Sequence, residues 1–285
     1  MKILVTGANG QLGNELRLLL ETEMPGTTIY TDRDELDLTD AKAVEAFVLN
    51  NDITHIVNCA AYTAVDRAEE EKRQCALVNV DAVRNLGMAA DAAGARLIHI
   101  STDYVFDGTG HRPSRESDKV NPISQYGTTK RQGETILLAL APESIIIRTA
   151  WLYSSFGHNF VKTMLRLADT QPEIRVVSDQ IGTPTYASDL ARAILRILRS
   201  HQWVPGIYHF TNEGAASWYD FAHAIFRLAR KDVKLTPIPT EDFPTPAARP
   251  AYSILDRQRI KATYGVEIPH WEDALEDCLR KLNVL

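Results

Sequence analysis

The stretch that decides the fold is Lys2-Ile3-Leu4-Val5-Thr6-Gly7-Ala8-Asn9-Gly10-Gln11-Leu12-Gly13. Its first five residues form a short apolar run typical of a buried strand, and the leucines at 12, 16, 19 and 20 then recur at helical spacing to about Glu21. Three glycines fill the turn, so a pyrophosphate can approach the backbone at a helix N-terminus. A glycine-rich turn can also be purely structural, but a strand before it and a helix after it favour nucleotide binding.

Further apolar runs follow, alternating with helical patterns. They predict strands at 28–31, 55–59, 96–101 and 145–148, separated by a helix capped by Thr39 and by helices at 78–93 and 124–140. Continuous apolar strands alternating with helices indicate a parallel sheet that is covered on both faces. We therefore predict an α/β fold with a doubly wound, mostly parallel sheet.

The pattern is less regular after Trp151. It predicts a helix at 160–168, a helix capped by Ser188 that runs through Leu198, and a helix opened by Ser217. Strands are predicted at 175–177 and 207–210, and two short helices at the C-terminus. Five prolines predict an extended loop over 236–250. We expect residues 1–150 to form a dinucleotide-binding domain, with elements near 175–212 returning to it. Residues 151–285 would mainly form a smaller lobe for substrate.

Composition excludes several classes of protein. The chain has 285 residues, of which 45% are hydrophobic and 24% charged, an ordinary globular mixture. Its net charge of −6 argues against nucleic-acid binding, and no apolar run approaches the roughly 18 residues that cross a membrane. Three cysteines without a CxxC pair favour a cytoplasmic location. The eight histidines show no metal-binding spacing, so we expect no metal site.

Tyr126 and Lys130 are four residues apart on a predicted helix and so share one face. We expect the lysine to lower the pKa of the phenol, which could then protonate a carbonyl oxygen as hydride arrives at the carbon. This spacing is common on solvated helices, but here the helix lies between the fourth and fifth strands, where a cofactor would bind. Thr102, at the end of the fourth strand, is our choice over Ser101 to hold the carbonyl.

Residues after the second strand bear on the coenzyme. Asp32 lies 19 residues after Gly13, where a carboxylate typically binds the ribose 2′-hydroxyl of NAD. Arg33 could instead meet the 2′-phosphate of NADP, so these two residues leave the choice between NADH and NADPH open. Asp37 and Leu38 are a second candidate pair beside the adenine.

Taken together, these motifs resemble a known family. The glycine turn, Asn58-Cys59-Ala60-Ala61-Tyr62, Ser101-Thr102-Asp103-Tyr104-Val105-Phe106-Asp107-Gly108 and the Tyr126–Lys130 pair resemble the extended short-chain dehydrogenase/reductases, which have a Rossmann sheet. Three further stretches more closely resemble the dTDP-4-dehydrorhamnose reductase family: Ala61-Tyr62-Thr63-Ala64-Val65-Asp66, Arg148-Thr149-Ala150-Trp151-Leu152-Tyr153 and Asp179-Gln180-Ile181-Gly182-Thr183-Pro184-Thr185. That family uses NADPH or NADH to reduce the 4-keto group of dTDP-4-dehydro-L-rhamnose, giving dTDP-L-rhamnose for bacterial surface polysaccharide.

The resemblance implies roles for individual residues. Thr102, Tyr126 and Lys130 would be catalytic, and Lys130 would also bind the nicotinamide ribose. The other implied cofactor-binding residues are Gly7, Asn9, Gly10, Gln11, Leu12, Gly13, Ala60, Ala61, Tyr62 and Asn79. The implied sugar-nucleotide residues are Val65, Asp103, Tyr104 and Trp151, with Asn159 and Arg249 as weaker candidates for the diphosphate.

Two alternatives stay open. A sugar-nucleotide epimerase or dehydratase on the same scaffold would retain and regenerate NAD, although Asp103 lacks the neighbouring glutamate that some dehydratases need. The family also resembles the non-catalytic β subunit of methionine adenosyltransferase, so a regulatory role is possible. Membership further implies a possible homodimer, and some members use a divalent ion, for which the sequence offers no ligand cluster.

Overall fold

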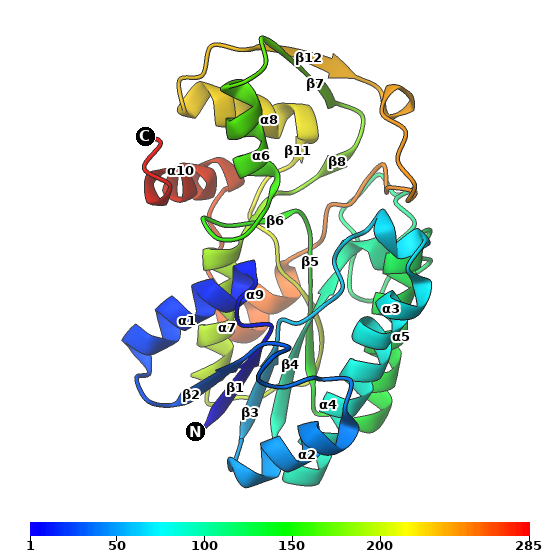
Figure 1. Cartoon of the computed structure of the whole chain (residues 1–285), viewed down its shortest axis with the longest axis vertical. Coiled ribbons are helices and arrows are strands. Elements are labelled where there is room, and N and C mark those ends of the chain that lie inside the picture. Colours follow the sequence, from blue (N-terminus) through cyan, green and yellow to red (C-terminus); the bar gives the residue numbers. More distant parts are fainter.

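A computed structural model describes all 285 residues of the chain. Its centre is a six-stranded, fully parallel sheet in the order β10-β5-β4-β3-β1-β2 (Figure 1). The strands are β1 (Ile3–Thr6), β2 (Thr28–Thr31), β3 (His55–Asn58), β4 (Arg96–Thr102), β5 (Ile145–Thr149) and β10 (Gly206–His209). The strand order reverses between β1 and β3, and in open parallel sheets such a crevice at the carboxyl ends is where ligands bind. The predicted fold class is confirmed.

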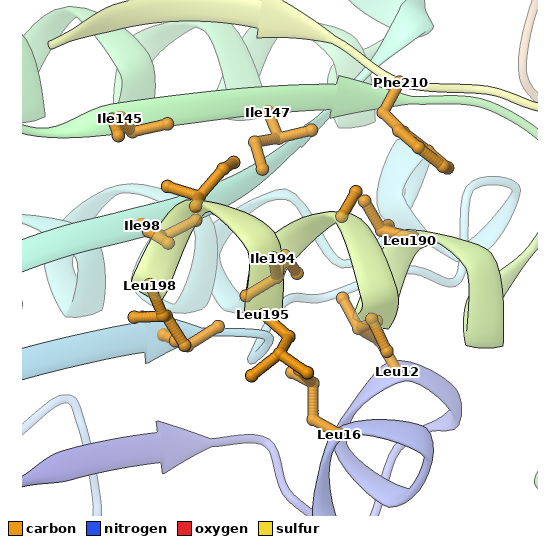
Figure 2. Close-up of a cluster of buried hydrophobic side chains, with 14 of the residues drawn as sticks. Leu12, Leu16, Ile98, Ile145, Ile147, Leu190, Ile194, Leu195, Leu198 and Phe210 are labelled. Atoms are coloured by element: carbon orange, nitrogen blue, oxygen red, sulfur yellow. The ribbon is translucent and has the colours of Figure 1, made fainter. Parts of the chain in front are cut away.

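Helices cover both faces of this sheet. One face carries α1 (Gln11–Glu23), α7 (Ala187–Leu198) and α9 (Gln258–Tyr264); the other carries α2 (Ala41–Asn50), α3 (Lys72–Ala76), α4 (Ala82–Ala93) and α5 (Gln125–Leu140). A wide π turn at Leu77–Asp81 joins α3 to α4. Alternate strand residues face opposite layers: Ile145 and Ile147 pack toward α1 and α7 (Figure 2), whereas Ile146 packs toward α4 and α5.

A second lobe lies beyond the carboxyl ends of the sheet (Figure 1). It has its own buried cluster, built around Phe221, Ile225, Trp271 and Leu275. Its helices are α6 (Phe160–Ala168), α8 (Trp218–Leu228) and α10 (Trp271–Lys281). Its short strand pairs are β6 (Leu152–Tyr153) with β9 (Thr185–Tyr186), β8 (Ile181–Gly182) with β11 (Ala216–Ser217), and β7 (Glu173–Val177) with β12 (Lys234–Ile238). None of the helices is both long and apolar enough to cross a lipid bilayer.

Two predicted helix caps are wrong. Asp40, not Thr39, caps α2, because its carboxylate accepts the N–H groups of Lys42 and Ala43. The Thr39 hydroxyl instead donates to Asp37, at 2.7 Å. The helix α7 begins at Ala187, which puts Ser188 inside its first turn. Asp and Ser are both good caps, so sequence preference alone does not fix the starting residue. Ser217 does cap α8, with Asp220 completing a capping box.

The prediction of a loop over the whole of 236–250 is also wrong, because β12 continues through Pro237 to Ile238. Proline lacks an N–H but is tolerated in an edge strand, and β12 pairs only with β7. Of the strands expected to return to the main sheet, β10 does so beside β5, whereas β7 stays in the second lobe.

Candidate active site

A cavity of about 770 Å³ lies at the carboxyl ends of the strands, where a dinucleotide-binding crevice was expected. Nineteen of the predicted site residues line it: Gly7, Gly10, Gln11, Leu12, Gly13, Asp32, Arg33, Asp37, Leu38, Ala60, Ala61, Val65, Thr102, Asp103, Tyr104, Tyr126, Lys130, Trp151 and Arg249. The structure therefore brings together segments that are up to 242 positions apart in the chain (249 − 7).

One part of the lining, the glycine wall, consists of Gly7, Gly10, Gly13, Asp32 and Arg33. A Cβ on Gly13 would lie 2.4 Å from the Gly7 carbonyl oxygen, and Gly7 itself has a φ of +63°. Only glycine fits both positions, so the turn folds tightly under the start of α1. Gly10 caps that helix without a side-chain hydrogen bond, which leaves first-turn N–H groups for an anion. This cradle fits the pyrophosphate of a dinucleotide.

The end of β2 gives the glycine wall its charged groups. The Asp32 carboxylate accepts the backbone N–H groups of Asn9, at 3.0 Å, and Arg33, at 2.8 Å. Asp32 thus fixes the turn while remaining in the cavity wall beside the exposed Arg33 guanidinium. Hydrogen bonds from the side chain and the backbone N–H of Thr39 lower the pKa of Asp37 and keep it ionised.

Tyr126 and Thr102 both line the cavity. The Thr102 hydroxyl donates to the carboxylate of Asp103 at 2.9 Å and accepts the backbone N–H of Tyr104 at 3.1 Å. Burial raises the pKa of Asp103 to about 7, partly opposed by this hydrogen bond from Thr102. While Asp103 is ionised, the one hydroxyl proton of Thr102 is used in this hydrogen bond. Thr102 can then accept a further hydrogen bond, but it cannot donate one to a substrate carbonyl oxygen.

The expectation that Lys130 lowers the pKa of Tyr126 is wrong. Burial raises the pKa of this phenol above its ordinary value, and the Thr102 hydroxyl opposes the shift by a smaller amount. Lys130 is itself only 1% exposed, and its Nζ donates to the carbonyl oxygen of Ile100 at 2.7 Å. Burial lowers the pKa of Lys130 to about 8. The helical spacing correctly placed both groups in the lining of one cavity, but burial, and not the lysine, determines the direction of the pKa shift of the phenol.

A second part of the lining, the tryptophan wall, consists of Tyr104, Trp151, Trp218 and Arg249. Trp151 follows β5 with a φ of +47°, and its indole stacks on that of Trp218 with centroids 3.6 Å apart and planes 10° from parallel. Tyr104 packs edge-on against Tyr126 at 5.5 Å, and Arg249 donates to the Tyr104 hydroxyl at 3.2 Å. Arg249 also pairs with Asp66 at 2.7 Å.

Trp218, His158 and Asp66 are site residues that the sequence analysis missed; the first two line the cavity and Asp66 holds Arg249. The helix expected from Ser217 onward located the start of α8, and Trp218 is the first residue of that helix. Nothing in the local pattern indicates that this helix end reaches Trp151, which is 67 positions earlier (218 − 151).

Four predicted site residues do not line the cavity: Asn9, Tyr62, Asn79 and Asn159. Asn79 holds the loop after β3, since its amide accepts the N–H of Tyr62 at 2.9 Å and donates to the carbonyl oxygen at 3.1 Å. Asn159 caps α6 and donates to the Gln11 side chain at 3.0 Å. The structure therefore places both amides behind the wall rather than in it.

Comparison with known proteins shows relatives that match nearly the whole chain. The family model described as RmlD substrate binding domain matches residues 1–284. A dTDP-4-dehydrorhamnose reductase of Aggregatibacter actinomycetemcomitans is 42% identical, covering 97% of each chain. A dTDP-4-keto-6-deoxy-D-glucose reductase of Streptomyces niveus is 40% identical, covering 98% of this chain and 97% of that one.

Two solved structures match almost the whole fold. A dTDP-4-dehydrorhamnose reductase from Clostridium acetobutylicum superposes with a TM-score of 0.96 at 46% identity, covering 99% of this chain and all of that one. The enzyme of the same name from Bacillus anthracis, solved in complex with NADP, gives 0.94 at 40% identity with the same coverage. The chain therefore belongs to the RmlD family, the family of the dTDP-4-dehydrorhamnose reductases.

Proposed function

We propose that the protein reduces the 4-keto group of dTDP-4-dehydro-L-rhamnose to give dTDP-L-rhamnose, with NADPH or NADH as the reductant. The observation that carries this proposal is a buried, protonated phenol, that of Tyr126, in the same cavity as a glycine cradle suited to a pyrophosphate. The 40–46% identity to named 4-ketoreductases over nearly the whole chain supports the reaction class.

The bound nicotinamide would supply the hydride, and the residues of the chain would supply everything else. Gly7, Gly10 and Gly13 would hold the pyrophosphate at the start of α1, and Lys130 the nicotinamide ribose. Tyr126 would give its proton to the ketone oxygen as that oxygen gains charge. Its raised pKa suits a proton donor, because the phenol stays protonated until a much more basic alkoxide develops beside it.

Thr102 and Asp103 would position the ketone. If Asp103 is protonated, it can donate to Thr102, and the Thr102 hydroxyl is then free to donate to the substrate oxygen. A pKa of about 7 puts both forms of Asp103 within the working range. The tryptophan wall would carry the deoxysugar, since a flat indole suits its apolar methyl edge.

Arg249 would help to bind the diphosphate. It is 26% exposed at its side chain and already paired with Asp66, so a phosphate would share the guanidinium with that carboxylate. We further propose that residues 1–150 hold mainly the dinucleotide and residues 151–285 mainly the sugar nucleotide.

The deciding experiment supplies dTDP-4-dehydro-L-rhamnose with NADPH and, separately, with NADH. We expect stoichiometric loss of the nicotinamide absorbance and formation of dTDP-L-rhamnose. A redox-neutral conversion of the sugar would identify an epimerase or dehydratase instead, and no conversion of any dTDP-sugar together with a bound protein partner would identify a regulatory subunit. Offering dTDP-4-keto-6-deoxy-D-glucose in parallel tests whether the cavity selects one 4-keto sugar.

We place the reaction in the cytoplasm, where three unpaired cysteines remain reduced. A homodimer is also proposed, on the family resemblance alone. Sedimentation at micromolar concentration tests it: a single species near 32 kDa would contradict the dimer, since one chain has a mass of 31.8 kDa.

A further inference from the structure

A chain of buried hydrogen bonds runs behind the cavity and ends on Lys130. It passes from Thr6 on β1 through Asn58 on β3 and His99 on β4 to the amine of Lys130 on α5. All four side chains are 1% exposed or less. His99 and Asn58 play no part in the reaction proposed above, yet they determine which proton faces the lysine.

The direction of each hydrogen bond follows from one fixed donor. The backbone N–H of Ala60 points at the side chain of Asn58 at 3.1 Å and can only donate, so the atom it meets is the amide oxygen. The amide nitrogen of Asn58 therefore faces Nδ1 of His99, at 3.0 Å, and donates to it. With Nδ1 as an acceptor, the proton of a neutral imidazole is on Nε2.

That Nε2–H points at the Nζ atom of Lys130, 3.3 Å away. A lysine ammonium has three donors and no acceptor, so a charged Lys130 places two donors against each other. A neutral amine has a lone pair for the Nε2–H and can still donate to the carbonyl oxygen of Ile100. Only the neutral amine satisfies the whole chain.

We propose that His99 is a positioning residue for Lys130: held by Asn58 with its proton on Nε2, it presents an N–H to the amine and favours the uncharged form. Burial keeps His99 itself neutral, since its pKa is well below the ordinary value. The consequence for catalysis rests on the function proposed above, but the protonation pattern does not.

The other titratable groups near Lys130 do not replace this effect. Glu134, one turn along α5, favours the charged amine, but both its oxygens bind Arg148 at 2.7 Å. Cys75 on α3 and Tyr126 on α5 both have raised pKa values and are neutral. His99 is the one neighbour that presents a proton to Nζ.

The first test is the tautomer of His99, read from nitrogen–proton couplings in 15N-histidine-labelled protein without coenzyme or substrate. We expect a neutral ring protonated on Nε2 from pH 5 to pH 9. His209 is an internal contrast: it is equally buried, but its Nδ1 meets the carbonyl oxygen of Ser114 at 3.1 Å and must carry the proton. A His99 ring protonated on Nδ1, or on both nitrogens, overturns the proposal.

The second test follows the Nζ signal of Lys130 in 15N-lysine-labelled protein as the pH is raised. In His99→Gln, the glutamine carbonyl oxygen can turn toward the amine, so we expect the pKa of Lys130 to rise by about one pH unit. The matched control is His209→Gln, which should leave that pKa unchanged. An unchanged pKa in His99→Gln contradicts the proposal.

Asn58→Asp should reverse the hydrogen bond to His99 while leaving His99 and Lys130 themselves unchanged, because the new carboxylate can only accept. We expect the proton of His99 to move to Nδ1 in this variant, and a proton that stays on Nε2 argues against the relay through Asn58. If the protein shows these signals but reduces no sugar nucleotide, the proposed function fails and the inference stands. If the protein reduces the sugar nucleotide but His99 is protonated on Nδ1, the proposed function stands and the inference about His99 fails.

Discussion

The glycine wall and the tryptophan wall of the cavity are built in different ways. The glycine wall comes from residues 7–33, a short stretch of backbone turn and strand end. Its shape depends on backbone conformations and close contacts that glycine allows. The tryptophan wall consists of side chains from positions 104, 151, 218 and 249, which only the finished fold brings together. Under the function proposed above, one short stretch would encode binding of the cofactor pyrophosphate, whereas recognition of the sugar would need side chains from across the chain.

The largest effect is expected at Tyr126, which lines the same cavity as both walls and packs against Tyr104 of the tryptophan wall. Tyr126→Phe removes the proposed proton donor and should lower kcat by about 10²- to 10⁴-fold. Coenzyme binding, measured by nicotinamide fluorescence, should change little because the glycine wall is intact. A variant that keeps most of the wild-type kcat would remove this phenol from the mechanism.

Asp103, beside Thr102 in the cavity lining, should make the stability of the protein sensitive to pH. The pKa of Asp103 is raised to about 7 in the folded protein, whereas in the unfolded chain it is near 4. The stability that the protonated carboxyl contributes is therefore fully present below pH 4 and is lost as the pH rises through 7. Asp103→Asn should therefore gain stability relative to wild type, by a few kcal/mol, between pH 5 and pH 8. Thermal unfolding of both proteins across this range checks the sign; a gap that is constant with pH would refute it.

The glycine wall should tolerate no added methyl at its tightest point. Gly13→Ala places a Cβ 2.4 Å from the Gly7 oxygen, and overpacking of this kind costs about 1–3 kcal/mol. We expect a matching loss of unfolding free energy and weaker binding of NADPH, with the KM for the sugar nucleotide unaffected. Gly110→Ala is the control, because its Cβ would meet nothing closer than 3.6 Å. Equal NADPH affinities in the two variants would contradict this account of the turn.

The smallest effect is expected at the tryptophan wall. Trp218→Ala removes the ring that supports Trp151, and stacked aromatic pairs are worth about 0.5–1.5 kcal/mol beyond their buried area. We expect the KM for the sugar nucleotide to rise about 3- to 10-fold, while NADPH binding is unchanged. Tyr219→Ala, at the next position of α8, is the control. A change in NADPH binding alone would show that the two walls are not separate.

The same contrast explains what could be read from the sequence. The five strands of the sheet within residues 1–150 and the glycine turn follow from local periodicity, and Thr102 and Tyr126 follow from their places at a strand end and on the next helix. Which later strand joins the sheet did not follow, since β10 does so and β7 does not. Trp218 could not be found this way, because its partner is 67 positions away (218 − 151) and no local pattern links them. The pKa of Tyr126 was predicted in the wrong direction because spacing shows which charge is near, but not how far water is excluded.

The position of β10 has a consequence for how the protein is made. This strand completes the sheet at Gly206–His209, after α6, β7 and α7 have already left the ribosome. A chain stopped after residue 150 would expose β5 as an open edge and leave α1 without the apolar face of α7. Residues 1–150 therefore cannot complete the sheet and its helical cover during synthesis until the chain has been made through β10.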